Sequence, residues 1–412
     1  MANLMLTVGG VWGTIIGWFQ SFIPSFGLTI IVFTIALKLI LSPLEIYQKI
    51  SSKKTAEKQA ILQPKIEKLQ KQYGNNKELL NQKTMELYKK ENFNLMGSCL
   101  GMLINLIITI LVFFTLFSSL NQISQYNIKT EYADLTENYK IVITTKLKQD
   151  AENNASITIT TDEDLNALIE EINNDANLTE SQKASKINTL KLKTIINDID
   201  SSSLTDDEKL ALKANAKEFA TKESANYYGE IKEGFLWIKN IYRPDTYAST
   251  FPNSDEYLKI SGVNFDGVSA ENPYEDIYGV SYLTKDEAMN AFKNNFNEVA
   301  GAINTKYSGW NGWLILVALS GIITVLSIFI TNLSNKPKPQ YDKKGNEIQA
   351  KKPNNYLMMI LLPILMIVFT LQYSAAFALY IVMNSLMSVI IGFVTTLVMN
   401  KIEKSKEQKK EV

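Results

Sequence analysis

The sequence predicts an all-α polytopic membrane protein with five transmembrane helices, and two observations lead to this fold class. Five long apolar runs span residues 27–44, 95–119, 313–331, 357–371 and 375–399. Each approaches the roughly 20 residues that a helix needs to cross about 30 Å of hydrocarbon. Charges also separate by position, because residues 121–308 hold 31 Asp and Glu against 19 Lys and Arg, while the rest of the chain holds 11 against 23.

Lysine-rich segments set the expected orientation. Because lysine favours the cytoplasmic side of a membrane, we place residues 48–94, 332–356 and 400–412 in the cytoplasm. The N-terminus and residues 121–308 then lie outside, and the C-terminus lies in the cytoplasm. The tryptophans agree, since all of them fall on the outer side, several where an interfacial aromatic belt belongs: Trp12, Trp18, Trp237, Trp310 and Trp313.

The first part of the chain is expected to form an outer N-terminus, a span and a hairpin. Within the extracytoplasmic residues 1–26, the stretch 11–22 is typical of a short interfacial helix. No charged n-region and no cleavage site mark a removed signal peptide. The first span covers residues 27–47. Residues 48–94 show a heptad-like apolar pattern that breaks at Gly74 and then resumes, which predicts a cytoplasmic helical hairpin.

The rest of the chain alternates spans with polar segments. The remaining spans are expected at residues 95–120, 309–331, 357–372 and 375–399. The last two form a tight hairpin, because their joint apolar stretch is too long for one span and is interrupted by polar residues. The other segments are an acidic, mainly helical extracytoplasmic insertion at 121–308, a basic cytoplasmic loop at 332–356 and a basic cytoplasmic tail at 400–412.

Composition argues against several classes of site. Cys99 is the only cysteine, so no intramolecular disulfide framework is expected. The sequence contains no histidine, which excludes a His-based catalytic triad and His-ligated metal sites. It also contains no P-loop motif. We therefore expect a protein that is not an enzyme, hydrolyses no nucleotide and needs neither metal nor cofactor.

Polar residues recur along one face of four of the predicted spans. Single polar residues inside membranes usually hold helices together, but four such faces could instead line one hydrated cavity. The spacing that places them on a common face is that of an α-helix. The candidate lining residues are Thr34 and Lys38 in the first span, Ser98, Asn105 and Thr109 in the second, Ser320, Thr324 and Ser327 in the third, and Tyr380, Asn384 and Ser388 in the fifth.

Lys38 is the central candidate, because a charge at mid-membrane costs about 2.5–3.5 kcal/mol on insertion scales. Its side chain could snorkel to the cytoplasmic surface. However, Glu45, which marks that surface, lies seven residues further along the chain. This is about 10 Å along a helix, which exceeds the comfortable reach of a lysine stem. We expect no Asp or Glu within the spans to pair with Lys38. An unpaired cation favours a water-filled pocket that receives a negative group from elsewhere.

Several stretches resemble the YidC family of bacterial membrane-protein insertases, part of the YidC/Oxa/Alb superfamily. They include GLTIIVFTIALKLILSPLEIYQK at 27–49, ILQPKIEKLQKQYG at 61–74 and ELYKKENFNLMGSCLGMLI at 86–104. Later similarities are FLWIKNIYRPD at 235–245 and a closing hairpin with LLPILM and ALYIVMNSLMS. The chain resembles Gram-positive members of the family with an enlarged extracytoplasmic insertion. Its localisation would then be the bacterial cell membrane.

The resemblance implies a monomeric insertase whose five helices enclose a hydrophilic groove, open to the cytoplasm and to lipid. Lys38 stands where the family most often has an arginine, so the charge is kept but the planar fork that grips a carboxylate is lost. Nascent membrane proteins are the implied clients, with membrane lipids around the protein. The ribosome and the Sec translocon are further candidate partners.

The polar faces and the resemblance together predict a mechanism. Lys38 would draw the short, often acidic outer tail of a nascent protein into the groove, and the apolar segment of that protein would leave along the third and fifth spans. Two other classes stay open. A secondary transporter would share the polar faces and the buried cation, although internal repeats and coupling carboxylates are not visible. A membrane scaffold that displays the acidic segment would not need Lys38.

Overall fold

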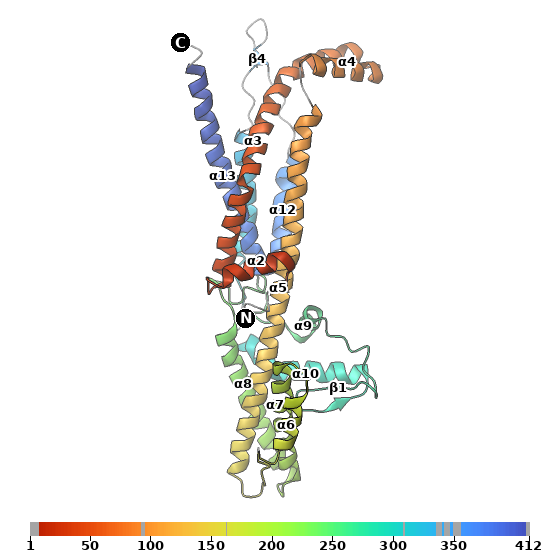
Figure 1. Ribbon diagram of the computed structural model, residues 1–412, viewed down its shortest axis with the longest axis vertical. Coiled ribbons are helices and arrows are strands. Elements are labelled where there is room, and N and C mark those ends of the chain that lie inside the picture. The colour runs from red at the N-terminus through yellow and green to blue at the C-terminus, as the bar shows by residue number, and fades with distance from the viewer. Residues whose placement is uncertain are drawn as a thin grey trace. The chain divides into compact units, whose positions relative to one another are not determined.

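The computed structural model (Figure 1) describes residues 8–91, 95–161, 163–307, 310–334, 340–341, 347–348 and 356–408. Helices dominate these residues, as the predicted all-α class requires. The described strands form two short antiparallel pairs, β1 (Tyr274–Glu275) with β2 (Ser281–Tyr282) and β3 (Gln340–Tyr341) with β4 (Glu347–Ile348). The chain divides into two compact units, the first made of Met1–Gln122 with Leu314–Val412, and the second of Ile123–Trp313.

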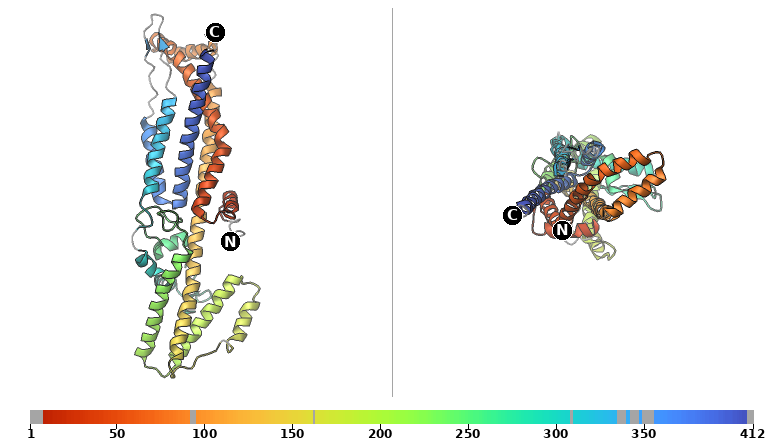
Figure 2. Two further views of the ribbon diagram at one scale, coloured as in Figure 1. Left: turned by 90° about the vertical axis from the view of Figure 1, so that its left-hand side faces the viewer. Right: turned by 90° about the horizontal axis from the view of Figure 1, so that it is seen from above.

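The first unit is a group of apolar helices. Its described helices are α2 (Gly10–Gln20), α3 (Phe26–Tyr73), α4 (Lys77–Lys90), the first part of α5 (Leu95–Glu152), α11 (Ile315–Ser334), α12 (Tyr356–Gln372) and α13 (Ala375–Gln408). Helix α13 packs against both α3 and α11, and α11 also packs against α12 (Figure 2). Helix α13 therefore holds a central position in this unit.

Three helical segments among the described residues are long and apolar enough to cross a membrane: Phe26–Thr55, Leu106–Glu152 and Ala375–Ile402. Two shorter apolar helices, Ile315–Ile330 and Ile360–Gln372, fall where the third and fourth spans were predicted. Length and composition thus support a membrane protein with several spans. The arrangement of five spans stays a prediction.

The first predicted span and the first arm of the hairpin form one helix. Helix α3 continues through Pro43 and Pro64 to Tyr73. A proline removes one backbone donor and usually bends a helix, but membrane helices tolerate it where neighbouring groups satisfy the freed carbonyl. The chain then turns, and α4 begins after Asn76, whose side chain accepts a hydrogen bond from the N–H of Leu79 at 3.1 Å.

The second unit contains several amphipathic helices around an aromatic core. Its described elements are the second part of α5, α6 (Asn166–Asn174), α7 (Glu180–Ser201), α8 (Asp206–Ile231), α9 (Ser254–Ser261), β1, β2 and α10 (Lys285–Lys306). Helix α8 starts with a capping box in which the side chains of Thr205 and Glu208 satisfy each other's backbone N–H groups. The rings of Tyr132 and Phe296 stack with centroids 4.8 Å apart, so burial of aromatic area contributes to the stability of this unit.

Two irregular stretches of the second unit, residues 239–248 and 311–313, are joined by a dense set of hydrogen bonds. Backbone bonds link Lys239 N to Asn311 O, Asn311 N to Ala248 O and Gly312 N to Thr246 O, at 2.9, 2.9 and 3.1 Å. The fully buried Asn311 side chain accepts from Asn240 N and donates to the carbonyls of Asn240 and Pro244, each at 2.9 Å. These bonds satisfy backbone groups that have no helix or strand partner.

Candidate functional site

Lys38 lies on α3 in the first unit, and its side chain is only 8% exposed. Its ammonium group donates a hydrogen bond to the Ser388 hydroxyl of α13 at 2.7 Å and forms an ion pair with Glu45 of its own helix. The prediction that Lys38 has no acidic partner is therefore wrong. Helical side chains lean towards the N-terminus, so the Glu45 side chain extends back towards Lys38. The two side chains together bridge the distance along the helix axis that a lysine alone was expected to bridge.

A cavity of about 60 Å³ lies next to this ion pair. One water needs about 10–15 Å³ of such volume, so the cavity has room for more than one. Aliphatic and aromatic side chains make up much of its wall. Its polar lining consists of Lys38, Glu45, Thr109, Tyr380 and Asn384, from helices α3, α5 and α13. The site can therefore hold water and polar groups beside a buried cation.

The structure brings together part of the predicted set. Thr109, Tyr380 and Asn384 line the cavity with Lys38, and Ser388 contacts the Lys38 ammonium. Thr34 is buried one turn before Lys38, and its hydroxyl donates to the Ile30 carbonyl at 2.6 Å, away from the cavity lining. The side chains of Ser98 and Asn105 fall outside the described part of the structure.

The polar face of α11 lies elsewhere. The Ser320 hydroxyl is 3.2 Å from that of Thr370 on α12, and the Thr324 hydroxyl donates to the Ser320 carbonyl at 2.6 Å. Ser327 is half-buried on the same helix, and none of these three residues lines the cavity. For Ser320, the geometry is that of a hydroxyl joining two helices.

Two charged residues of α3 that have partners in the structure were not foreseen from the sequence: Glu45, at the cavity, and Lys49, which is not part of the cavity lining. Glu45 was taken only as a marker of the cytoplasmic surface and not as a partner of Lys38, although residues seven apart in a helix share a face. Lys49 donates from its ammonium group to the Gly392 carbonyl of α13 at 2.5 Å. A Cβ at position 392 would lie 3.1 Å from this nitrogen, so glycine there permits the close approach.

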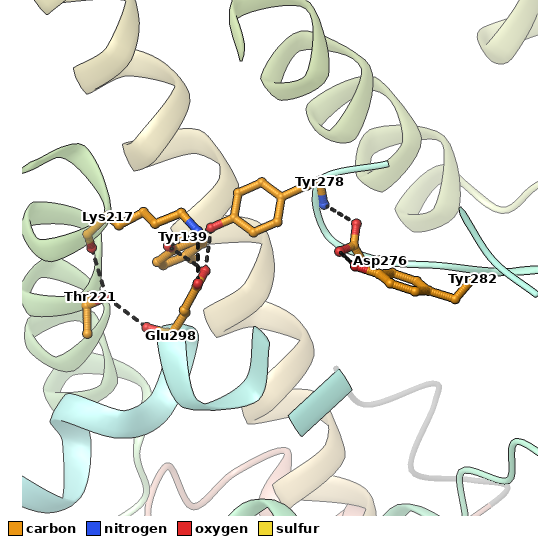
Figure 3. Close-up of polar contacts among 7 residues, drawn as sticks. All are labelled: Tyr139, Lys217, Thr221, Asp276, Tyr278, Tyr282 and Glu298. Atoms are coloured by element: carbon orange, nitrogen blue, oxygen red, sulfur yellow. Dashed lines mark hydrogen bonds and ion pairs between the residues drawn. The ribbon is translucent and has the colours of Figure 1, made fainter. Parts of the chain in front are cut away.

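A second polar cluster lies in the second unit (Figure 3). The Glu298 carboxylate accepts hydrogen bonds from Tyr278 and from Lys217, the latter at 2.9 Å, while the Tyr139 hydroxyl lies 3.1 Å from that of Tyr278. Burial, followed by the neighbouring Tyr139 and Glu298, raises the pKa of Tyr278, so its hydroxyl stays protonated and donates. The Thr221 hydroxyl donates to the Glu298 carbonyl at 2.9 Å. Because its members bond to one another, the cluster fits a structural role.

Among the described residues, no group of three or more His, Cys, Asp or Glu side chains is placed to bind a metal ion. The cavity beside Lys38 offers a cation, a carboxylate and hydroxyl groups instead. Such a set can exchange hydrogen bonds and ion pairs with an entering polar segment.

Comparison with known proteins adds an independent finding. A family model described as "60Kd inner membrane protein" matches residues 18–163. The membrane protein insertase YidC of Fusobacterium nucleatum subsp. nucleatum is 40% identical over 101 residues, which are 24% of this chain and 47% of the relative. The YidC of Caldanaerobacter subterraneus subsp. tengcongensis is 36% identical over 104 residues, 25% of this chain and 48% of the relative.

A third relative, the YidC of an Anaeromyxobacter species, is 38% identical over 102 residues, 25% of this chain and 18% of the relative. The chain thus spans about half the length of the first two relatives and less of the third. No solved structure matches the chain. The matched region contains α3, α4 and the residues of α5 that line the cavity.

Proposed function

Because the chain belongs to the YidC family of membrane protein insertases, we propose that it moves short hydrophilic tails of nascent membrane proteins across the bilayer through the groove beside Lys38. The observation that supports this most directly is the buried Lys38 ammonium, which adjoins a cavity with polar lining on three helices. A buried cation next to space for water lowers the cost of carrying a negatively charged tail part-way across the membrane.

The proposed reaction needs no nucleotide. A client carboxylate approaches Lys38, exchanges hydrogen bonds with the groove and is held there while the adjoining apolar segment of the client enters lipid. Transfer of that segment into lipid contributes about 0.8 kcal/mol per CH₂ group. Over a whole span this term exceeds the cost of carrying a short polar tail. Lys38 is a binding residue in this scheme, and no covalent bond changes.

We propose that the client leaves along α11 and α13, which pack side by side. Both helices expose large apolar side chains, among them Ile322 and Phe329 on α11 and Ile390 and Phe393 on α13. In a membrane such side chains contact acyl chains, and an apolar client segment can replace those chains at little cost. Release into lipid would then require no opening of the α3 and α13 contact.

The proposed topology has five spans, with residues 121–308 outside the cell and the hairpin at 48–94 in the cytoplasm. It is tested in a Cys99→Ser background by adding one cysteine at an exposed position, with Asp207→Cys in α8 or Met85→Cys in α4. A membrane-impermeant maleimide should label position 207 in intact cells and position 85 only after permeabilisation. The Cys99→Ser parent controls for background labelling, and the opposite pattern would refute the topology.

The function itself is tested with the purified full-length chain in liposomes and a small single-span client synthesised in their presence. Insertion is scored as a client fragment protected from added protease. With the chain present, the amount of protected fragment should exceed the amount in empty liposomes. After synthesis has stopped, this insertion should require no added nucleotide. If a known insertase is active in parallel and this chain is not, the insertase proposal fails and a scaffold role gains weight.

A further inference from the structure

The partner of Lys38 lies on its own helix, which has a consequence for client choice. Among the described residues, the Lys38 ammonium bonds to the Glu45 carboxylate and the Ser388 hydroxyl. Glu45 also lines the cavity. Before any client arrives, the local charge of this ion pair is therefore zero, and a client carboxylate meets an occupied cation.

We propose that Glu45 is a specificity-determining residue, an internal counter-ion that competes with the acidic tail of a client for Lys38. The inference rests on the insertase function proposed above. It assigns Glu45 a role in selecting clients by the charge of their tails: the pair reduces the advantage that a bare cation would give to acidic tails, so that neutral tails are inserted at comparable rates.

The burial of the two partners fits an exchange of carboxylates. The Lys38 side chain is 8% exposed, whereas that of Glu45 is 29% exposed. Removing one partner of a buried ion pair leaves an uncompensated charge and is strongly unfavourable, so simple opening of this pair is disfavoured. When a client carboxylate takes the place of Glu45, Lys38 stays paired and the more exposed Glu45 is the group that turns towards water. Neutral tails offer no such replacement and leave the pair closed.

The test compares two clients that differ only in the outer tail, one with Asp and Glu and one with Asn and Gln at the same positions. Each is inserted into liposomes that contain the full-length wild type, Glu45→Gln or the control Glu67→Gln. Glu67 is an exposed residue of the same helix. Its replacement removes one negative charge that lies outside the cavity lining. The readout is the ratio of acidic-tail to neutral-tail insertion.

We expect Glu45→Gln to raise this ratio by about fivefold, which corresponds to about 1 kcal/mol of relieved competition. Glu67→Gln should leave the ratio at the wild-type value. In a Lys38→Gln background, Glu45→Gln should raise the ratio less than it does in the wild type, because only the repulsion between Glu45 and an acidic tail is then relieved and the cation for which Glu45 competes is absent. Should Glu45→Gln fail to accumulate, Glu45→Asp keeps the charge but withdraws the carboxylate by one CH₂ and should raise the ratio in the same direction.

The outcomes separate this inference from the function on which it rests. An unchanged ratio in Glu45→Gln, with both clients inserted, overturns the role of Glu45 and leaves the insertase proposal intact. An increase of the same size in the Lys38→Gln background as in the wild type also overturns it, because Glu45 would then act only as a general negative charge. If the wild type inserts neither client above empty liposomes, the proposed function fails and this inference with it.

Discussion

Lys38→Ala should lower insertion of a client with an acidic outer tail by about tenfold to a hundredfold, since a hydrogen bond to a charged group contributes about 1.5–3 kcal/mol. The substitution removes the cation and leaves the Glu45 carboxylate at the cavity without its partner. An acidic tail would then meet a negative charge where it formerly met an ion pair. Insertion of a client with a neutral tail should fall much less. The measurement is the amount of protease-protected client in liposomes.

Two further variants make this result specific to the buried charge. Lys38→Arg keeps the cation and adds a planar fork that can hold a carboxylate with two hydrogen bonds, so it should match or exceed the wild type. Lys68→Ala removes an exposed cation from the same helix and should leave insertion unchanged. Equal insertion by all of these proteins would show that Lys38 serves only the packing of α3 against α13.

Helical periodicity predicted a substantial part of this site. It placed Thr109, Tyr380, Asn384 and Ser388 on polar faces, and the structure brings these residues around Lys38. Residues three or four apart share one side of a helix whatever the tertiary fold. Sequence alone can therefore identify a polar face, even when the helices that carry it are hundreds of residues apart in the chain.

Periodicity could not say which neighbour a polar face meets. The Ser320 hydroxyl on α11 approaches Thr370 on α12, outside the cavity lining, because helix packing and not spacing decides which faces meet. The Glu45 partner was missed for a different reason. Its distance was counted along the helix axis, whereas the approach of two long side chains depends on the reach of both.

In the second unit, too, some structural features have local causes in the sequence and others have non-local causes. The helix start at Thr205 follows from a short motif that any helix N-terminus can use. No such motif predicts the contact between residues 239–248 and residues 311–313, because its hydrogen bonds link irregular segments far apart in the sequence. The backbones of the two segments approach closely at this contact. This restricts which residues can occupy it, and Gly312 is the clearest case.

Gly312→Ala should destabilise the second unit by about 3 kcal/mol, in the upper range for overpacking of a well-packed site. A Cβ at this position would lie 1.7 Å from the Asp245 carboxylate oxygen and 2.9 Å from the Asp245 Cα. Asp245 is fully buried, and the same oxygen accepts a hydrogen bond from Trp313 N at 2.8 Å. Side-chain rotation alone cannot relieve the contact, since a backbone atom is also too close.

Gly301→Ala is the matched control for this prediction. Gly301 lies in α10, and a Cβ there would meet no atom within 4 Å. Replacing glycine by alanine inside a helix stabilises it by about 1 kcal/mol, so the two substitutions should act in opposite directions within one unit. Hydrogen exchange of residues 123–313 in the full-length protein measures both effects locally: protection should fall in Gly312→Ala and rise slightly in Gly301→Ala. Equal protection in both variants would mean that the 239–248 segment adjusts to an added methyl group. That result would contradict tight packing of this segment against residues 311–313.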